Sequence, residues 1–207
     1  MEWQFNEKVA ETFVSHAKQH IPNYSQVIDK SIEVCSHYLQ PQDKIIDVGC
    51  ATGETLRRLH SAGFSNLTGV EASHAMLQHC DFNIARILHN DRFPNEKFDG
   101  VLCNWTLHFI EDKEMYLVDI HRNMNENGVL VLSEKTSLDP TAIKFYHEWK
   151  HSQGVSWEDI RAKEAAVKDV MFIKDPKWYI DTLTWIGFKN IQIIDANWCF
   201  TTFMAVK

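Results

Sequence analysis

Short apolar runs alternate with amphipathic stretches along most of the chain. The apolar runs are bounded by small or polar residues that favour turns, and they predict strands at residues 45–49, 67–70, 84–88, 98–103 and 129–132. Between them, apolar residues recur at the spacing of one helical face and predict helices at 53–61, 74–80 and 112–124, the last followed by the helix-stop pair Asn127-Gly128. This alternation indicates an open, mostly parallel α/β sheet with helices on both faces.

Two segments depart from the alternation. Residues 9–39 have a helical pattern that is broken near Pro22, and they predict a helical cap over residues 1–40. Residues 139–171 predict two further helices, inserted after the fifth strand. Because they follow the end of a strand, we expect them to lie over the carboxyl ends of the sheet.

The last part of the chain predicts a helix and a hairpin. A helical pattern at 177–186 is followed by a turn at Gly187 and by two apolar runs, 191–194 and 200–206. These two runs predict a closing antiparallel hairpin, which brings the expected sheet to seven strands. No repeat or flexible linker divides the chain, so we expect residues 1–207 to form one domain.

Composition and charge exclude several classes of protein. The chain is 44% hydrophobic and 24% charged, which is typical of a globular protein. Its net charge is −7, with no basic block, so an extensive nucleic-acid surface is not expected. No apolar run is long enough to span a membrane, and the five cysteines include no Cys-x-x-Cys pair. We expect a soluble cytoplasmic protein that acts on a small molecule; a homodimer is left open.

The stretch after the first strand carries the most informative chemistry. Gly49, Ala51 and Gly53 let a ligand approach the backbone, and the helix that starts near Gly53 offers free amide groups. Glu71 ends the next strand, 18 residues after Gly53, where a carboxylate can accept hydrogen bonds from both hydroxyls of a ribose. This arrangement indicates a cofactor that contains a nucleoside.

The same stretch differs from a dinucleotide fingerprint. It lacks the Gly-x-Gly-x-x-Gly spacing, and Asp47 stands just before its first glycine. A carboxylate there would repel a pyrophosphate but would attract the ammonium and sulfonium of S-adenosylmethionine. We therefore expect S-adenosylmethionine; the alternative is that the small residues only permit a tight turn.

Several blocks resemble one family. The pattern is similar to class I S-adenosylmethionine-dependent methyltransferases, and more closely to the carboxy-S-adenosylmethionine synthases that serve wobble-uridine modification of tRNA. The similar blocks lie at 5–10, 21–25, 47–50, 104–109, 132–135 and 169–171. The resemblance runs over most of the chain and implies a Rossmann-like class I methyltransferase fold, with S-adenosylmethionine or its carboxylated form as the cofactor.

The resemblance also implies roles for individual residues. The residues that would contact the cofactor are Tyr24 from the cap, Gly49, Cys50 and Ala51 at its methionine end, Glu71 and Ala72 at its ribose, Asp91 and Arg92 at its adenine, and Asn104 beside the reacting centre. On residue type alone, Asp91 could instead cap a helix or turn, and Asn104 could be a turn residue.

One position departs from the family. In our alignment, Glu164 stands where the family has the arginine that holds the extra carboxylate of the carboxylated cofactor. A carboxylate would repel that group, although Arg161, Lys163 or Lys168 could supply a displaced cation. We therefore favour methyl transfer to a small acceptor, with carboxy-S-adenosylmethionine synthesis as the alternative.

Catalysis needs little from a methyltransferase beyond alignment and, for some acceptors, the removal of a proton. The candidates for the base are His108, after the fourth strand, and Glu134, after the fifth; both residues could equally be structural. A further alternative is a protein that binds the cofactor without catalysis.

A rival function comes from residues 147–151. His147-Glu148-x-x-His151 has the spacing of a zinc-peptidase helix, and a third metal ligand would have to come from Glu158, Glu164 or Asp169. The motif would then lie inside the insertion of an unrelated fold, so we expect a solvated helix face and no peptidase site. A metal bound opportunistically by His147 and His151 is left open.

Overall fold

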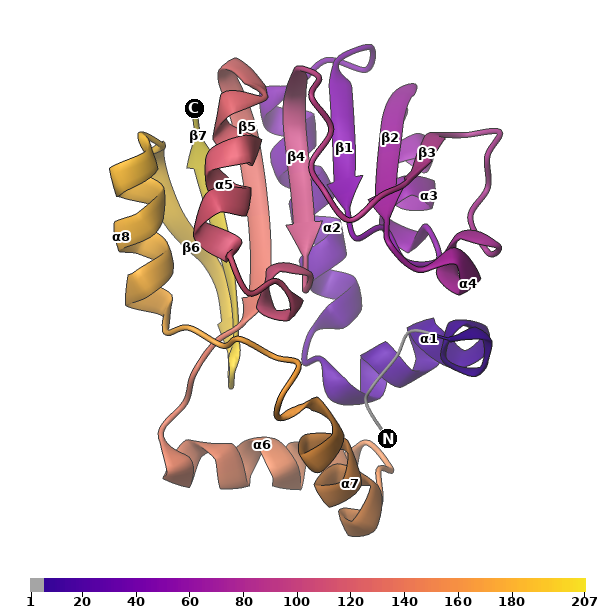
Figure 1. The fold of residues 1–207 in the computed structure, drawn as a ribbon, viewed down its shortest axis with the longest axis vertical. Helices are drawn as coiled ribbons and strands as arrows, with labels where there is room; N and C mark the ends of the chain where they lie inside the picture. Colours follow the sequence, from indigo (N-terminus) through magenta and orange to yellow (C-terminus); the bar gives the residue numbers. More distant parts are fainter. Residues whose placement is uncertain (1–5) are drawn as a thin grey trace.

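The computed structural model describes residues 6–207; Phe5, in the first of the blocks noted above, lies outside this range. Within it, the strands form one seven-stranded sheet in the order β3-β2-β1-β4-β5-β7-β6 (Figure 1). The strands are β1 Lys44–Val48, β2 Asn66–Glu71, β3 Arg86–His89, β4 Phe98–Asn104, β5 Met124–Lys135, β6 Lys189–Asn197 and β7 Phe200–Val206. β1 to β5 pair in parallel, whereas β7 is antiparallel to both β5 and β6, so the predicted fold class is confirmed.

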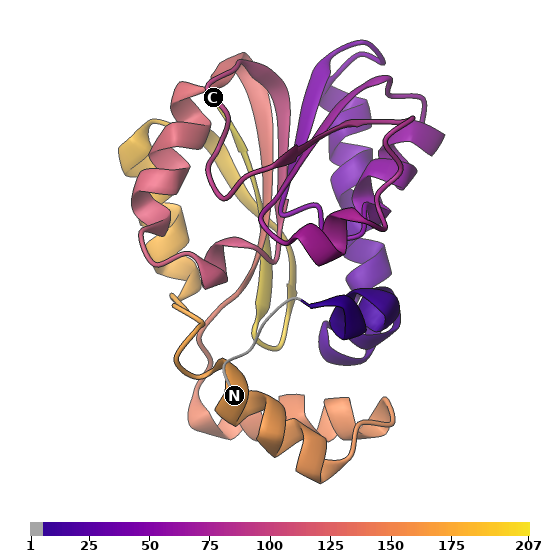
Figure 2. The same cartoon turned by 45° about the vertical axis from the view of Figure 1, so that its right-hand side comes forward.

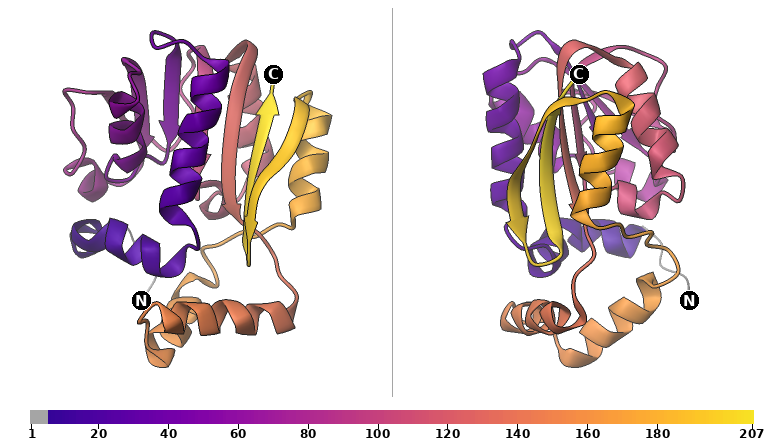
Figure 3. Two further views of the ribbon diagram at one scale, coloured as in Figure 1. Left: turned by 180° about the vertical axis from the view of Figure 1, so that it is seen from behind. Right: turned by 90° about the vertical axis from the view of Figure 1, so that its left-hand side faces the viewer.

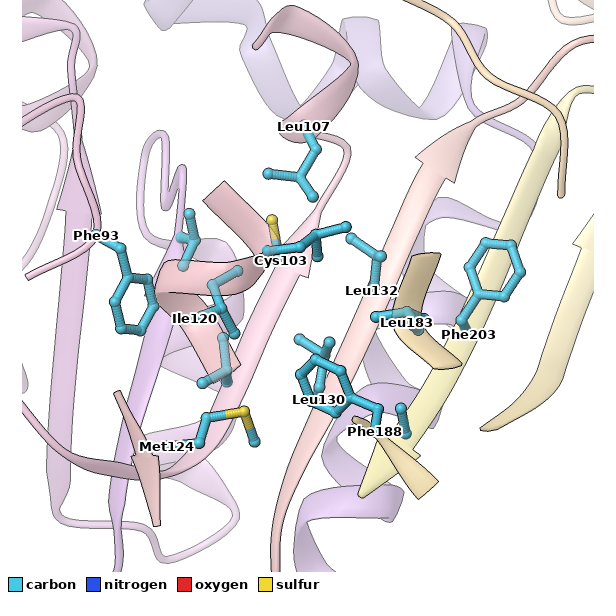
Figure 4. Close-up of a cluster of buried hydrophobic side chains, with 14 of the residues drawn as sticks. Phe93, Cys103, Leu107, Ile120, Met124, Leu130, Leu132, Leu183, Phe188 and Phe203 are labelled. Atoms are coloured by element: carbon cyan, nitrogen blue, oxygen red, sulfur yellow. The ribbon is translucent and has the colours of Figure 1, made fainter. Parts of the chain in front are cut away.

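Helices cover both faces of the sheet. α2 (Tyr24–Tyr38) and α3 (Glu54–Ser61) lie on one face, and α5 (Lys113–Arg122) and α8 (Pro176–Ile186) lie on the other (Figure 3). Figure 4 shows the core on the second face, where side chains of β4, β5 and β7 meet those of α5 and α8. In the described part of the chain, no helix combines the length and apolar character needed to cross a membrane.

Three helices lie beyond the carboxyl ends of the parallel strands. They are α1 (Glu7–His20), α6 (Pro140–Ser152) and α7 (Trp157–Val167), and Figures 1 and 2 show them across from the ends of β1, β4 and β5. Each begins at a capping side chain: Asn6, Asp139 and Ser156 accept hydrogen bonds from the first turn of α1, α6 and α7.

The insertion that carries α6 and α7 starts and ends at points that lie side by side in space. Thr136 and Lys174 form an isolated parallel bridge, and the Ser137 amide donates to the Lys174 carbonyl at 3.0 Å. The segment between them therefore leaves the sheet and returns to it at one place.

The helix-stop assignment of Asn127-Gly128 is wrong. α5 ends at Arg122, and both residues lie inside β5, where the pairing with β4 shifts register between Phe98 and Gly100. Asn127 has a positive φ of 64° and its amide donates to the Lys207 carbonyl. Asn127-Gly128 by itself favours the end of a helix, but its hydrogen bonds to Lys207, just after β7, hold it in a strand.

The predicted helix at 74–80 is also too long. α4 spans His74–Leu77, and the chain then tightens, because the His79 and Cys80 amides donate to the carbonyls three residues before them. The Cys80 thiol donates to the Ala51 carbonyl at 3.1 Å, which holds this turn against the loop after β1. β3 begins at Arg86 instead of Ile84, since residues 81–84 form a turn.

Candidate functional site

A cavity of about 610 Å³ opens at the carboxyl ends of β1, β2, β4 and β5, and α1, α6 and α7 contribute to its wall. Most of the residues that the sequence pointed to line it: Tyr24, Asp47, Gly49, Cys50, Ala51, Glu71, Ala72, Asp91, Asn104 and His108. Gly53, Arg92 and Glu134 are not among the lining residues.

Close packing determines the shape of the loop after β1. Gly49 has a φ of +69°, and a Cβ there would lie 2.2 Å from Oγ1 of Thr106. The Thr106 hydroxyl donates to the Val48 carbonyl at 2.9 Å, which fixes it against the loop. Gly53 has a φ of +80° and is the N-cap residue that precedes α3. The tight-turn explanation therefore accounts for the conformation of these glycines, and the ligand explanation is compatible with it.

Glu71 joins the two loops that frame the cavity. Its Oε2 accepts a hydrogen bond from the Ala51 amide at 3.0 Å, and its Oε1 accepts one from the Ser73 amide at 2.8 Å. Each carboxylate oxygen has a second lone pair, so the group can accept two more hydrogen bonds from a ligand. This geometry suits the two hydroxyls of a ribose.

Asp47 is the second-last residue of β1, just before the loop that follows this strand, and it is 2% exposed. Burial, with a smaller contribution from the neighbouring Cys80 and Glu71, raises the pKa of the Asp47 carboxyl well above its usual value. A cation in the cavity would favour the ionised carboxylate and lower this pKa again. The position therefore suits a cationic ligand.

Asn104, at the end of β4, is the clearest sign of a missing hydrogen-bond partner. It is 9% exposed, and within the described residues neither Nδ2 nor Oδ1 has a partner. A buried amide left in this way costs free energy, about 1–3 kcal/mol, unless a ligand or water supplies a donor and an acceptor.

Glu134 is fully buried among protein groups and is not among the residues that line the cavity. Its Oε1 accepts from the Thr106 and Leu107 amides at 3.2 and 2.8 Å, and its Oε2 lies 2.9 Å from Nδ1 of His108. Tyr179 adds a contact at 3.5 Å. The arrangement supports the loop after β4 and orients the His108 ring. Of the two roles that the sequence left open for Glu134, base or structural residue, it favours the structural one.

Tyr24 and Trp105 close one side of the cavity. Their rings stack with centroids 4.9 Å apart, and both residues line the cavity. Trp105 has a positive φ of 59°, a strained conformation for a bulky residue. The stack joins the start of α2 to the loop after β4, so the predicted cap does contact the loop that follows Asn104.

Two lining residues had no role in the sequence interpretation. Lys135 ends β5 and Lys150 lies on α6, and both face the cavity. The available signal was the one-turn spacing of Tyr146 and Lys150, which places them on one face of the helix. That signal does not tell which way the helix faces.

The two histidines of the zinc-like motif have separate partners. His147 contacts the carboxylate of Glu164, whereas Nδ1 of His151 lies 3.0 Å from the Val155 carbonyl and its ring stacks on Trp157. Among residues 6–207, no group of three or more His, Cys, Asp or Glu side chains is placed to hold a metal ion. Glu158, Glu164 and Asp169 therefore do not complete a site with this pair.

Known proteins resemble the chain both in sequence and in fold. A carboxy-S-adenosyl-L-methionine synthase from Cronobacter sakazakii is 26% identical over all of this chain and 92% of its own length. Among solved structures, a methyltransferase from Archaeoglobus fulgidus covers 94% of this chain and 99% of its own, with a TM-score of 0.66 and 14% identity. The magnesium protoporphyrin IX methyltransferase from Synechocystis, solved with bound S-adenosylhomocysteine, covers 100% of this chain and 90% of its own, with a TM-score of 0.67 and 15% identity.

The family assignment rests on a model of the methyltransferase domain. That model matches residues 19–172, a range that includes the loop after β1, Glu71, Asn104 and His108. The chain therefore belongs to the methyltransferase-domain family and is an enzyme that uses S-adenosylmethionine.

Proposed function

We propose that the protein transfers the methyl group of S-adenosylmethionine to a small-molecule acceptor bound in the same cavity. The observation that carries this proposal is the unpartnered amide of Asn104, which faces a cavity that also exposes Asp47 and Glu71. One end of the cavity therefore offers groups for a ribose and a cationic amino acid, and the other end is left for an acceptor.

The residues present fit the cofactor. Glu71 would accept from the ribose hydroxyls, Asp47 would face the cationic end, and Asn104 would hydrogen-bond the amino-acid part. Asp91, which lines the cavity, would accept a hydrogen bond from the adenine amino group. Cys50 and Ala72 would make van der Waals contacts with the cofactor. Contacts of Gly53 and Arg92 with the cofactor stay predictions, and so does the formation of a homodimer. When bound, the cofactor supplies an already activated methyl group, so the protein mainly has to align the acceptor with it.

His108 is the residue that we propose as the base. It lines the cavity, and the Glu134 carboxylate 2.9 Å from Nδ1 favours the tautomer with its proton on Nδ1. Nε2 is then a proton acceptor. In this arrangement Glu134 is a positioning residue and His108 is the group that touches the acceptor.

Replacing His108 by glutamine should lower kcat about 100-fold for an acceptor that must lose a proton, because a positioned base contributes about that much or more. Glutamine can still donate to Glu134, so the affinity for S-adenosylhomocysteine should stay within about twofold. Acceptors can be found by incubating cell metabolites with methyl-labelled cofactor. The matched control is His60→Gln on the exposed end of α3. Unchanged kcat in His108→Gln would remove the residue from the mechanism.

Carboxy-S-adenosylmethionine synthesis is the second candidate. It is favoured by relatives with that name that are similar along all of this chain. Against it stands Glu164, which lines the cavity and contacts His147 where our alignment expects a carboxylate-binding arginine.

Mass spectrometry of the small molecule released on denaturation separates the two candidates. We expect S-adenosylmethionine or S-adenosylhomocysteine from the purified protein, and transfer of label to a methylated product. A species heavier by one carbon dioxide unit would contradict methyl transfer as the main activity and favour the second candidate. Tight binding of the cofactor with no transfer to any metabolite would contradict both.

A further inference from the structure

The side of the cavity formed by the α6–α7 insertion has an excess of basic groups. We call it the insertion side, and it is lined by His20, Lys135, Tyr146, Lys150, Lys163 and Glu164. Figures 1 and 2 show the helices that carry most of these residues lying across from the strand ends. The opposite side, with Asp47 and Glu71, is acidic.

Two ammonium groups share one aromatic ring on the insertion side. Nζ of Lys150 lies 4.4 Å from the ring centroid of Tyr146, and Nζ of Lys135 lies 5.9 Å from the same centroid. The Tyr146 ring is held in turn, because its hydroxyl donates to the His20 carbonyl at 2.7 Å. The lysines are therefore gathered over a fixed platform.

Lys150 is buried without a counterion. It is 3% exposed, and across residues 6–207 neither Lys150 nor Lys135 forms an ion pair with a carboxylate. A lysine as buried as this is normally paired, since removing an ammonium from water is costly. Burial lowers the pKa of Lys150 to about 8, and Lys135 adds to this effect while Glu164 opposes it.

The other groups around the two lysines do not neutralise them. Burial lowers the pKa of His20 to about 3, and the charges of His16, Lys163, Lys150 and Lys135 add to this effect. The buried Nδ1 of His20 has no hydrogen-bond partner within the described residues. Burial lowers the pKa of Lys163 to about 7, so near pH 7 this side chain is about half protonated and adds no negative charge. Burial raises the pKa of the Cys199 thiol to about 11, so the thiol is neutral near pH 7. Glu164 contributes one carboxylate, which contacts His147 and is 42% exposed.

We propose that the insertion side binds an acidic group, a carboxylate or a phosphate, of the molecule that reacts at the cofactor, with Lys150 and Lys135 as its ligands. The proposal rests on the proposed function, because it gives the chemical class of the acceptor for that reaction. A bound anion would supply the counterion that Lys150 lacks. Acidic groups at one side of the cavity and basic groups at the other would also orient an acceptor that is negatively charged at one end.

The test measures anion binding directly, with S-adenosylhomocysteine already bound. Malonate and inorganic phosphate are titrated calorimetrically into wild-type protein and into Lys150→Met, which keeps the length of the side chain and removes its charge. We expect both anions to bind the wild type and to bind Lys150→Met roughly 10-fold more weakly or worse, the usual effect of losing one charged hydrogen bond. Lys135→Met should show the same direction of change, and it keeps the test open if Lys150→Met does not fold.

Two controls separate this proposal from the proposed function. Lys144→Gln, on the exposed face of the same helix, should bind both anions as the wild type does. The affinity for S-adenosylhomocysteine is measured first, and it should be the same in all variants. Wild-type protein that binds S-adenosylhomocysteine but neither anion would overturn the lysine assignment. Failure to bind S-adenosylhomocysteine would count against the proposed function, and malonate titrated into the free protein would still test the lysines.

The acidic group could belong to the acceptor or to a carboxylated cofactor. If wild-type protein releases the carboxylated species and Lys150→Met releases only the plain one, the lysines bind the cofactor's carboxylate. If neither protein releases it and malonate binding depends on Lys150, the acidic group belongs to the acceptor. Both results support an anion site, but the first would overturn the assignment of the acidic group to the acceptor. Anion binding that is equal in every variant contradicts the site itself.

Discussion

Replacing Glu71 by alanine is expected to weaken the binding of S-adenosylhomocysteine at least about 100-fold. The carboxylate would accept two hydrogen bonds from the ribose, and hydrogen bonds to a charged group contribute about 1.5–3 kcal/mol each. The same substitution releases the Ala51 and Ser73 amides, which Glu71 holds at 3.0 and 2.8 Å. The cofactor would therefore meet a loop that is less well ordered as well as a missing partner.

Calorimetric titration of S-adenosylhomocysteine measures this effect. Glu33→Ala, at an exposed position of α2, is the matched control and should bind as the wild type does. Glu71→Gln should lie between the two, because an amide keeps one acceptor but cannot accept from both loop amides. An affinity within about twofold of the wild type in Glu71→Ala would refute the ribose assignment.

Replacing Glu134 by alanine is expected to lower the free energy of unfolding by about 3–5 kcal/mol, as breaking a buried charged network does. Glu134 is 0% exposed and accepts from two backbone amides of the loop after β4, at 3.2 and 2.8 Å, as well as contacting His108. Alanine would leave these donors buried without an acceptor. The effect falls on folding, and on catalysis only through the orientation of His108.

Urea denaturation gives the free energy of unfolding for this comparison. Tyr179→Phe is a control for the same network, because its hydroxyl is at the limit of hydrogen-bond distance from Oε2, at 3.5 Å, and its loss should cost less than about 1 kcal/mol. A Glu134→Ala protein as stable as the wild type would contradict the assignment of Glu134 as the support of this loop.

The sheet and the side of the cavity that holds Asp47 and Glu71 were predictable because short stretches of sequence specify them. The first strand is expected at 45–49 and observed at Lys44–Val48, since an apolar run followed by small residues has few other solutions. The residues that end neighbouring parallel strands must meet at one edge, so Asp47, Glu71 and Asn104 could be brought together without a structure.

The errors come from residues whose surroundings are set by distant parts of the chain. Asn127-Gly128 favours the end of a helix locally, but Lys207, at the end of the chain, pairs with both residues. Glu134 and Lys135 are neighbours in sequence, yet one is enclosed behind the loop after β4 and the other lines the cavity. Successive residues of a strand point to opposite sides, and the sequence alone does not say which side is the cavity.

The neighbouring ends of the α6–α7 insertion bear on how an enzyme of this kind can change. Thr136 and Lys174 are bridged, so the segment between them can be lengthened, shortened or replaced without displacing the strand ends that carry Asp47, Glu71 and Asn104. In the proposed site, the residues assigned to the cofactor and those assigned to the acceptor are therefore encoded largely in different stretches of the gene. Selection can alter the second while the first stays intact, with Lys135, on the sheet side of the junction, as a fixed point that every new insertion has to accommodate.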